Sequence, residues 1–306
     1  MLLESPDTVH CRMREQARVP AGYHLVSLLA LILILMVETY YRDSLYQSSL
    51  GFIKDIQAGA SDTAATLWSL YSNVGVASAV GVPPLVLFLV YWRRIEGLYY
   101  AISLTAMLFL MNVTKLWYHE ARPYWSDSDI RAFDCSTQFG NPSGHSLFSM
   151  GAAMIIWLDF NDHASKKDDE SWMKKLWVRL PLLLVALVFS FTIGYSRLFL
   201  GVHTWNQTLF GWQFGLWLAL TIQFCYKGTL LYHMDKIQTG KADKYLPYIA
   251  WTLVLFLLVN AIETVNVLLV TPRVEADPMV ATWTKNILAA CPNANMEEAF
   301  AAKSEI

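Results

Sequence analysis

Apolar residues recur along this chain in long runs that are separated by polar segments. Seven such runs cover about residues 21–41, 67–92, 97–117, 143–160, 180–200, 208–226 and 245–270. A helix needs about 20 mostly apolar residues to cross the hydrocarbon core of a bilayer. The pattern therefore predicts an all-α integral membrane protein with about seven transmembrane helices.

The composition supports this class and excludes several others. Of the 306 residues, 55% are apolar and 16% are charged, whereas a soluble domain has roughly 45–50% and about 25%. Only 15 Gly, 11 Pro and 4 Cys are present, which excludes collagen-like, disordered and disulfide-scaffold chains. The net charge of -2 indicates no nucleic-acid partner, and the expected surroundings are the lipid bilayer.

Polar segments flank the predicted membrane domain. We expect a polar cytoplasmic N-terminus over residues 1–20, a transmembrane domain over 21–270 and a polar C-terminal tail over 271–306. The first apolar run is too long for a signal-peptide core, so it predicts a retained anchor. With seven crossings, 14 of the 23 Lys and Arg residues lie on the N-terminal face. That face is predicted to be cytoplasmic and the opposite one external or lumenal.

A first polar cluster ends the third apolar run, at Lys115–Pro123. Lys115 and Arg122 are seven residues apart, nearly two helical turns, so one helix would point both side chains the same way. Pro123 predicts that the helix ends at Arg122. The alternative is an ordinary pair of cations that reach toward the membrane surface from a helix end.

A second cluster, Asn141–His145, opens the fourth run. Asn141 suits a helix N-cap and Pro142 the first helical position. The free amides of such a terminus, near Ser143 and Gly144, bind anions readily, with His145 in the first turn. The alternative is a capped helix with a surface histidine.

A third cluster, Ser196–His203, joins the fifth and sixth runs. Arg197 and His203 would lie about 120° apart on a continuous helix, so a shared site requires a break, which we predict at Gly201. The topology brings all three clusters to one membrane face. Because charged groups at membrane-embedded helix ends are costly and usually functional, the three cations, the helix N-terminus and the two histidines predict a phosphate pocket.

In order and spacing, the three clusters resemble the signature of the type 2 phosphatidic acid phosphatase and vanadium haloperoxidase family. The pattern is Lys-x6-Arg-Pro, then Pro-Ser-Gly-His, then Ser-Arg-x5-His. The resemblance covers about residues 97–226, the motif core, and implies a helix bundle of the type 2 phosphatidic acid phosphatase kind. In detail the motifs look most like those of glucose-6-phosphatase and dolichyl diphosphatase.

The resemblance also implies a mechanism and a set of site residues. His203 would be the nucleophile that forms a phosphohistidine, and His145 the general acid. The implied phosphate-binding residues are Lys115, Arg122, Ser143, Gly144 and Arg197. We expect no metal and no cofactor, and a phosphomonoester or diphosphate of a lipid, polyprenyl or sugar as substrate. The implied location is the endoplasmic reticulum membrane, with the site facing the lumen.

One position departs from the family pattern. Most members have Asp four residues after the third-cluster histidine, and this chain has Gln207. Gln207 can orient the imidazole but adds no negative charge. An alternative function is therefore a catalytically inactive member that serves as a structural subunit of a larger membrane complex. A haloperoxidase is a third reading, opposed by the membrane-spanning runs.

Two further features lie in the polar segments. Asp127, Asp129 and Asp134 fit no calcium-loop spacing, so we expect a solvated acidic loop. Cys135 and Cys291 both fall on the predicted lumenal face. Since such a compartment is oxidising, the pair is a candidate disulfide, with two free thiols as the alternative.

Overall fold

The computed structural model describes residues 19–90, 94–165, 172–239, 246–265, 277–294 and 296. Throughout these ranges the regular secondary structure is helical. Residues 1–18 of the predicted polar N-terminus and much of the predicted C-terminal tail lie outside the described residues. The boundaries of the three predicted regions stay predictions.

Helices occupy the described residues of all seven predicted apolar runs, and further helices lie between and after these runs. They are α2 (Ala21–Gln57), α3 (Asp62–Leu85), α4 (Arg94–Tyr118), α5 (Pro123–Ser126), α6 (Gly144–Ser165), α7 (Leu176–Phe199), α8 (Trp205–Thr221), α9 (Lys227–Thr239), α10 (Leu246–Val265) and α12 (Met279–Ala290). A π-helical turn, Val86–Val90, follows α3, and another, Ile222–Tyr226, joins α8 to α9.

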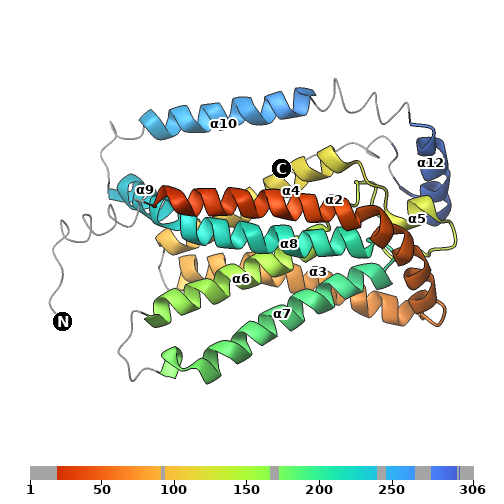
Figure 1. Cartoon of the computed structure of the whole chain (residues 1–306), viewed down its shortest axis with the longest axis horizontal. Helices are drawn as coiled ribbons and strands as arrows, with labels where there is room; N and C mark the ends of the chain where they lie inside the picture. The colour runs from red at the N-terminus through yellow and green to blue at the C-terminus, as the bar shows by residue number, and fades with distance from the viewer. Residues whose placement is uncertain are drawn as a thin grey trace.

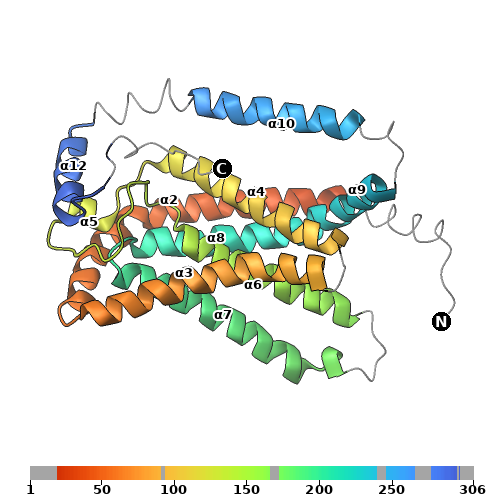
Figure 2. The ribbon, with the colours of Figure 1, turned by 180° about the vertical axis from the view of Figure 1, so that it is seen from behind.

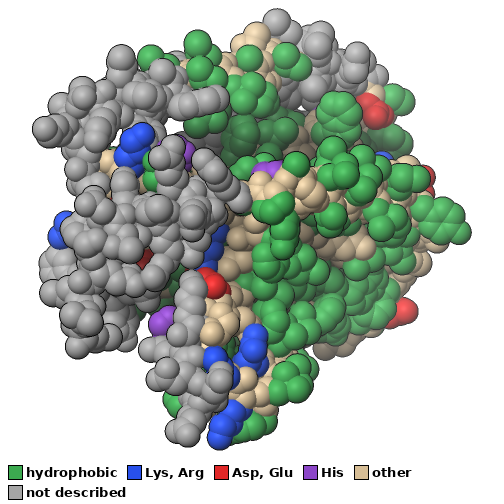
Figure 3. Space-filling view, turned by 60° about the vertical axis from the view of Figure 1, so that its left-hand side comes forward, with side chains coloured by type: hydrophobic (Ala, Val, Ile, Leu, Met, Phe, Trp, Pro, Cys, Tyr) green, Lys and Arg blue, Asp and Glu red, His purple; other side chains and the backbone are tan. Residues whose placement is uncertain are grey.

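Four stretches of the described residues are long and apolar enough to cross a membrane. They are Ala21–Gln57, Arg94–Ser126, Leu176–Phe199 and Trp205–Ile237. Leucine and valine side chains stand exposed along them, for example Leu33, which is 61% exposed. Figure 3 shows hydrophobic side chains covering a continuous part of the described surface. This surface is suited to lipid, so the protein is an integral membrane protein, while the number of seven crossings stays a prediction.

The long helices run side by side along one axis, with α8 packed chiefly against α6 and α2 (Figures 1 and 2). Glycines on α8 let α6 come close. A Cβ on Gly211 would lie 2.7 Å from the Ser143 carbonyl oxygen, and one on Gly215 would lie 2.3 Å from that of Leu147. Small residues at a helix interface are a usual means of close packing in membranes. The close approach holds the start of α6, where the second polar cluster lies, against α8.

Helix α2 is longer than the first apolar run, which ended at residue 41. It continues to Gln57 because polar side chains on its last turns are buried against other elements. Gln57 Nε2 donates to the Phe199 carbonyl at 2.9 Å, and Ser49 Oγ accepts from the Trp205 amide at 2.9 Å. These bonds tie the end of α2 to the junction between α7 and α8.

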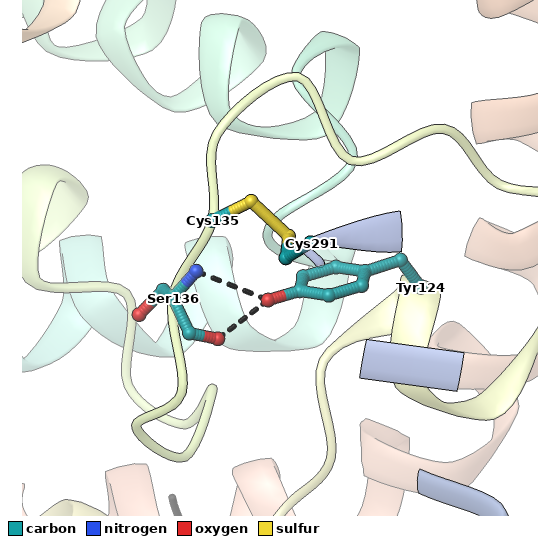
Figure 4. The surroundings of a disulfide bond; sticks show 4 residues. All are labelled: Tyr124, Cys135, Ser136 and Cys291. Carbon is teal, nitrogen blue, oxygen red and sulfur yellow. Dashed lines mark hydrogen bonds between the residues drawn. A yellow bond between two sulfur atoms is a disulfide. The ribbon is translucent and has the colours of Figure 1, made fainter. Parts of the chain in front are cut away.

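A disulfide joins Cys135 to Cys291, 156 residues further along the chain. Beside it, the Tyr124 hydroxyl donates to the Ser136 carbonyl at 2.5 Å and accepts from the Ser136 amide at 3.0 Å (Figure 4). The bond links the segment before α6 to α12, at the end of the bundle that carries α5 (Figure 1). Of the two alternatives for these cysteines, the structure has the disulfide.

The packing of α6 on α8 predicts a large effect of a small substitution. We expect Gly215→Ala to lower the free energy of unfolding by about 1–3 kcal/mol, because the added methyl group meets rigid backbone. Gly51→Ala, in α2, is the matched control, since its Cβ would have nothing within 4 Å. Thermal unfolding of both variants in detergent tests this, and equal midpoints would contradict it.

Candidate functional site

The three polar clusters meet at one end of the bundle, where α4 ends, α6 begins and α7 turns into α8 (Figures 1 and 2). His203 is buried there, and its Nε2 lies 3.2 Å from Arg122 Nη1. The charges of Arg197 and Lys115 also act on this imidazole. The structure therefore brings the predicted nucleophile together with the three predicted cations.

The backbone that leads from α4 to Arg122 differs from the predicted one. Helix α4 ends at Tyr118, not at Arg122, and His119 has a positive φ of 48°. A left-handed residue directly after a helix is a common way to end it. Arg122 is extended before α5, the conformation that Pro123 favours. Its guanidinium then donates to two backbone carbonyls, those of Gln138 at 2.7 Å and Val202 at 2.9 Å.

Arg197 is 3% exposed and holds two partners. Its Nη2 pairs with Asp134 at 2.9 Å and its Nη1 donates to Ser72 Oγ at 3.1 Å. The Nε of Arg197 has no hydrogen-bond partner within the described part of the chain. A buried donor without a partner is costly, so this edge of the guanidinium is suited to an anion. Asp134, from the predicted solvated acidic loop, keeps 33% of its side chain exposed while it pairs with this buried cation.

Lys115 is buried in the last turn of α4, 7% exposed. Its Nζ donates to Gln138 Oε1 at 3.4 Å, a long bond to a neutral group. A buried ammonium with one weak neutral partner is poorly compensated, so a bound anion would also stabilise the charge of Lys115. Gln138 contacts both Lys115 and Arg122. No motif in the sequence indicated that Gln138 belongs to the site.

The α7–α8 junction is broken at Gly201, as predicted. Helix α7 ends at Phe199, and Gly201 has φ +74°, where a Cβ would lie 2.2 Å from the Arg131 carbonyl oxygen. Only glycine fits this conformation and this space. The turn is closed by the His203 amide, which donates to the Arg197 carbonyl at 3.3 Å.

The start of α6 differs from the prediction. The helix begins at Gly144, and Asn141 does not cap it. The Asn141 side-chain amide donates instead to Glu120 at 2.7 Å and Glu38 at 3.2 Å. Bonds to charged acceptors are stronger than neutral ones, which is why Asn141 is drawn away. The Ser143 amide is also occupied, since it donates to the Gln207 carbonyl at 3.0 Å.

His145 lies in the first turn of α6 and is half-buried. Its Nε2 is 2.8 Å from Asn73 Oδ1, and it lies within electrostatic range of the same three cations. Asn73 and Ser72 both come from α3, which therefore forms one wall of the site. Neither residue could be predicted from the sequence, because α3 has no motif and no charged residue near them.

Gln207 fixes the His203 ring. Its Oε1 accepts from the Thr204 amide at 3.3 Å and faces His203 Nδ1 at 3.1 Å, while its Nε2 donates to the Ala121 carbonyl at 2.8 Å. A backbone N–H only donates and a carbonyl only accepts, so the orientation of the Gln207 amide is unambiguous. His203 Nδ1 must then carry the hydrogen, which leaves the Nε2 lone pair facing Arg122.

The His203 ring is also neutral. Burial lowers the pKa of His203 well below its usual range, and the charges of Arg122 and Arg197 lower it further. The unprotonated Nε2 of the neutral ring accepts from Arg122 Nη1, and it can attack an electrophile that takes up this cation's bond instead. This arrangement, at the end of a helical membrane bundle, is suited to an oxyanion.

Comparison with known proteins finds a matching family model. Residues 96–230 match the model of the PAP2 superfamily, and all three polar clusters lie inside this range. This match agrees with the resemblance seen in the motifs.

Relatives with established names match shorter segments. Dolichyldiphosphatase 1 of Rhinolophus ferrumequinum is 32% identical over 84 residues, 28% of this chain and 35% of that protein. The human protein of the same name is 33% identical over 75 residues, 24% of this chain and 31% of that protein. The matched segment thus spans about a third of the length of these relatives.

A solved structure is also similar. The transmembrane PAP2 type phosphatidylglycerolphosphate phosphatase from Bacillus subtilis aligns with a TM-score of 0.49 and 17% sequence identity. The alignment covers 71% of this chain and 98% of that chain.

The site geometry predicts specific loss of anion binding on removal of Arg197. We expect Arg197→Ala to weaken the binding of inorganic phosphate about 10- to 100-fold, the effect of losing charged hydrogen bonds in a buried site. Titration calorimetry in detergent measures it. Arg131→Ala is the control, because Arg131 is 51% exposed and pairs with Asp62 outside the site. Equal losses in both variants would contradict the assignment.

Proposed function

We propose that this protein is an integral-membrane phosphatase that hydrolyses a phosphomonoester or diphosphate through a phosphohistidine on His203, without a metal ion. One observation carries the proposal. The Nε2 of a buried, neutral His203, with its tautomer fixed by Gln207, lies 3.2 Å from Arg122. The phosphoryl group that Arg122 would hold is thereby placed next to the attacking nitrogen.

In the first step, His203 Nε2 attacks phosphorus, the P–N bond forms and the bond to the leaving oxygen breaks. His145 gives its proton to that oxygen. In the second step, a water attacks phosphorus, the P–N bond breaks and the water's proton passes to His145. Lys115, Arg122 and Arg197 stabilise the charge on the non-reacting oxygens throughout, usually the largest catalytic contribution.

A groove between α2, α4 and α8 favours a lipid substrate over a soluble sugar phosphate. It has a volume of about 450 Å³ and is lined by apolar side chains that include Leu31, Leu35 and Phe214, with Thr114 at its α4 side. Arg42 also lines the groove, and Thr114 directly precedes Lys115, so the groove and this cation belong to the same turn of α4. A polyprenyl diphosphate, which the relatives' name also suggests, fits this arrangement.

The disulfide supports the predicted location. Cys135 and Cys291 are bonded at the end of the bundle that carries the site, and disulfides persist in oxidising compartments. The resemblance implies the endoplasmic reticulum, so we propose that the site faces the lumen of that membrane.

Phosphate release by the purified protein in EDTA tests the proposal, with dolichyl diphosphate, phosphatidic acid and glucose 6-phosphate as substrates. We expect turnover of a lipid substrate, and a loss of at least about 1,000-fold in kcat for His203→Ala, as for other removed nucleophiles. His163→Ala is the control, since this exposed histidine lies near the other end of α6.

Three outcomes would count against the proposal. Unchanged activity of His203→Ala would show that another group attacks phosphorus. A requirement for added Mg²⁺ would contradict the metal-free mechanism. No turnover of any of the three substrates would favour the alternative, an inactive subunit of a membrane complex.

A further inference from the structure

Glu120 lies inside the first polar cluster, between Lys115 and Arg122, yet its side chain points to a different network. Its Oε1 accepts from Asn206 Nδ2 at 2.5 Å and from Gln207 Nε2 at 3.2 Å. Its Oε2 accepts from Asn141 Nδ2 at 2.7 Å. One carboxylate thus binds side chains from the start of α8 and from the segment that precedes α6.

All of these partners are neutral amides. No Lys or Arg of the described chain forms an ion pair with Glu120, in contrast to Glu38 nearby, which binds Arg42 at 2.5 Å. The charge of a carboxylate in an ion pair is largely cancelled by its cationic partner. A carboxylate that is bound only by neutral donors therefore exerts a stronger electrostatic field on the groups around it. The effect of Glu120 is strongest along the hydrogen bonds that it accepts, because hydrogen bonds in a chain polarise one another.

This chain of bonds leads to His203. The Gln207 amide donates to Glu120 on one side and accepts from His203 Nδ1 on the other, 3.1 Å away. When the ring becomes positive, its Nδ1–H polarises the Gln207 carbonyl, which makes the amide N–H groups better donors to the carboxylate. Negative charge two hydrogen bonds from the ring then stabilises the cation.

We propose that Glu120 is a positioning residue that acts on His203 through Gln207 and supplies the negative charge that a carboxylate next to the ring would otherwise give. The inference rests on the proposed function and adds a positioning residue to the same site. It also accounts for Gln207, since an amide can join a carboxylate to an imidazole by donating on one side and accepting on the other.

The isosteric variant Glu120→Gln tests the charge alone. We expect kcat for the lipid substrate with measurable turnover, dolichyl diphosphate or phosphatidic acid, to fall about 10- to 100-fold, the effect of losing a charged hydrogen bond. The affinity for inorganic phosphate should stay within about twofold, because the three cations are intact. Glu38→Gln is the matched control: it removes a buried carboxylate that also binds Asn141 but does not contact Gln207.

A second measurement uses the coupling between the two positions. In a Gln207→Glu background, a carboxylate stands directly beside His203 and the charge of Glu120 is no longer needed there. Adding Glu120→Gln to that background should therefore leave kcat unchanged or raise it, a strongly non-additive cycle. Equal losses from Glu120→Gln in both backgrounds would overturn the proposal.

The remaining outcomes also decide between the readings. If Glu120→Gln weakens phosphate binding as much as it lowers kcat, or if Glu38→Gln matches it, Glu120 has only a structural role and the inference is wrong. If Glu120→Gln has full activity while His203→Ala has none, the inference fails and the proposed function stands. If His203→Ala remains active, the proposed function itself fails.

Discussion

The burial of several like charges around one imidazole is the constraint on which the rest of the structure depends. Arg122 and Arg197 are each 3% exposed, and Lys115 is close to them. Buried cations are costly unless they are paired or hydrogen-bonded. The fold compensates them only in part, with backbone carbonyls for Arg122 and one carboxylate, Asp134, for Arg197. A tetrahedral oxyanion would complete the compensation, which is why the cluster is best understood as a binding site.

The two sides of the site have opposite charge, and His203 and Gln207 stand between them. The cations lie on one side, while Glu120 lies on the other and shares Asn141 with Glu38, whose charge is paired with Arg42. His203 presents Nε2 to the first side and Nδ1 to Gln207. In the proposed mechanism, this separation lets the ring attack at one nitrogen while its developing positive charge is stabilised at the other.

Much of the architecture could be predicted from the sequence because its signals are local. The apolar runs located the helices, and Gly201 marked the break that turns His203 toward Arg197. Local rules failed where tertiary contacts compete with them. Asn141 is a good N-cap in isolation but binds two buried carboxylates instead, and α2 extends to Gln57 because that side chain is bonded to the α7–α8 junction.

The sequence alone therefore determined the membrane class, the three clusters, and the chemical groups that meet at the site, since hydrophobic periodicity and motif spacing depend on neighbours along the chain. The tertiary structure alone decided the tautomer of His203, the partners of Asp134, the wall formed by α3 and the link from Glu120 through Gln207. These features depend on atoms that are distant in sequence and close in space. Their energies come from burial and hydrogen-bond geometry, which no pattern along the chain records.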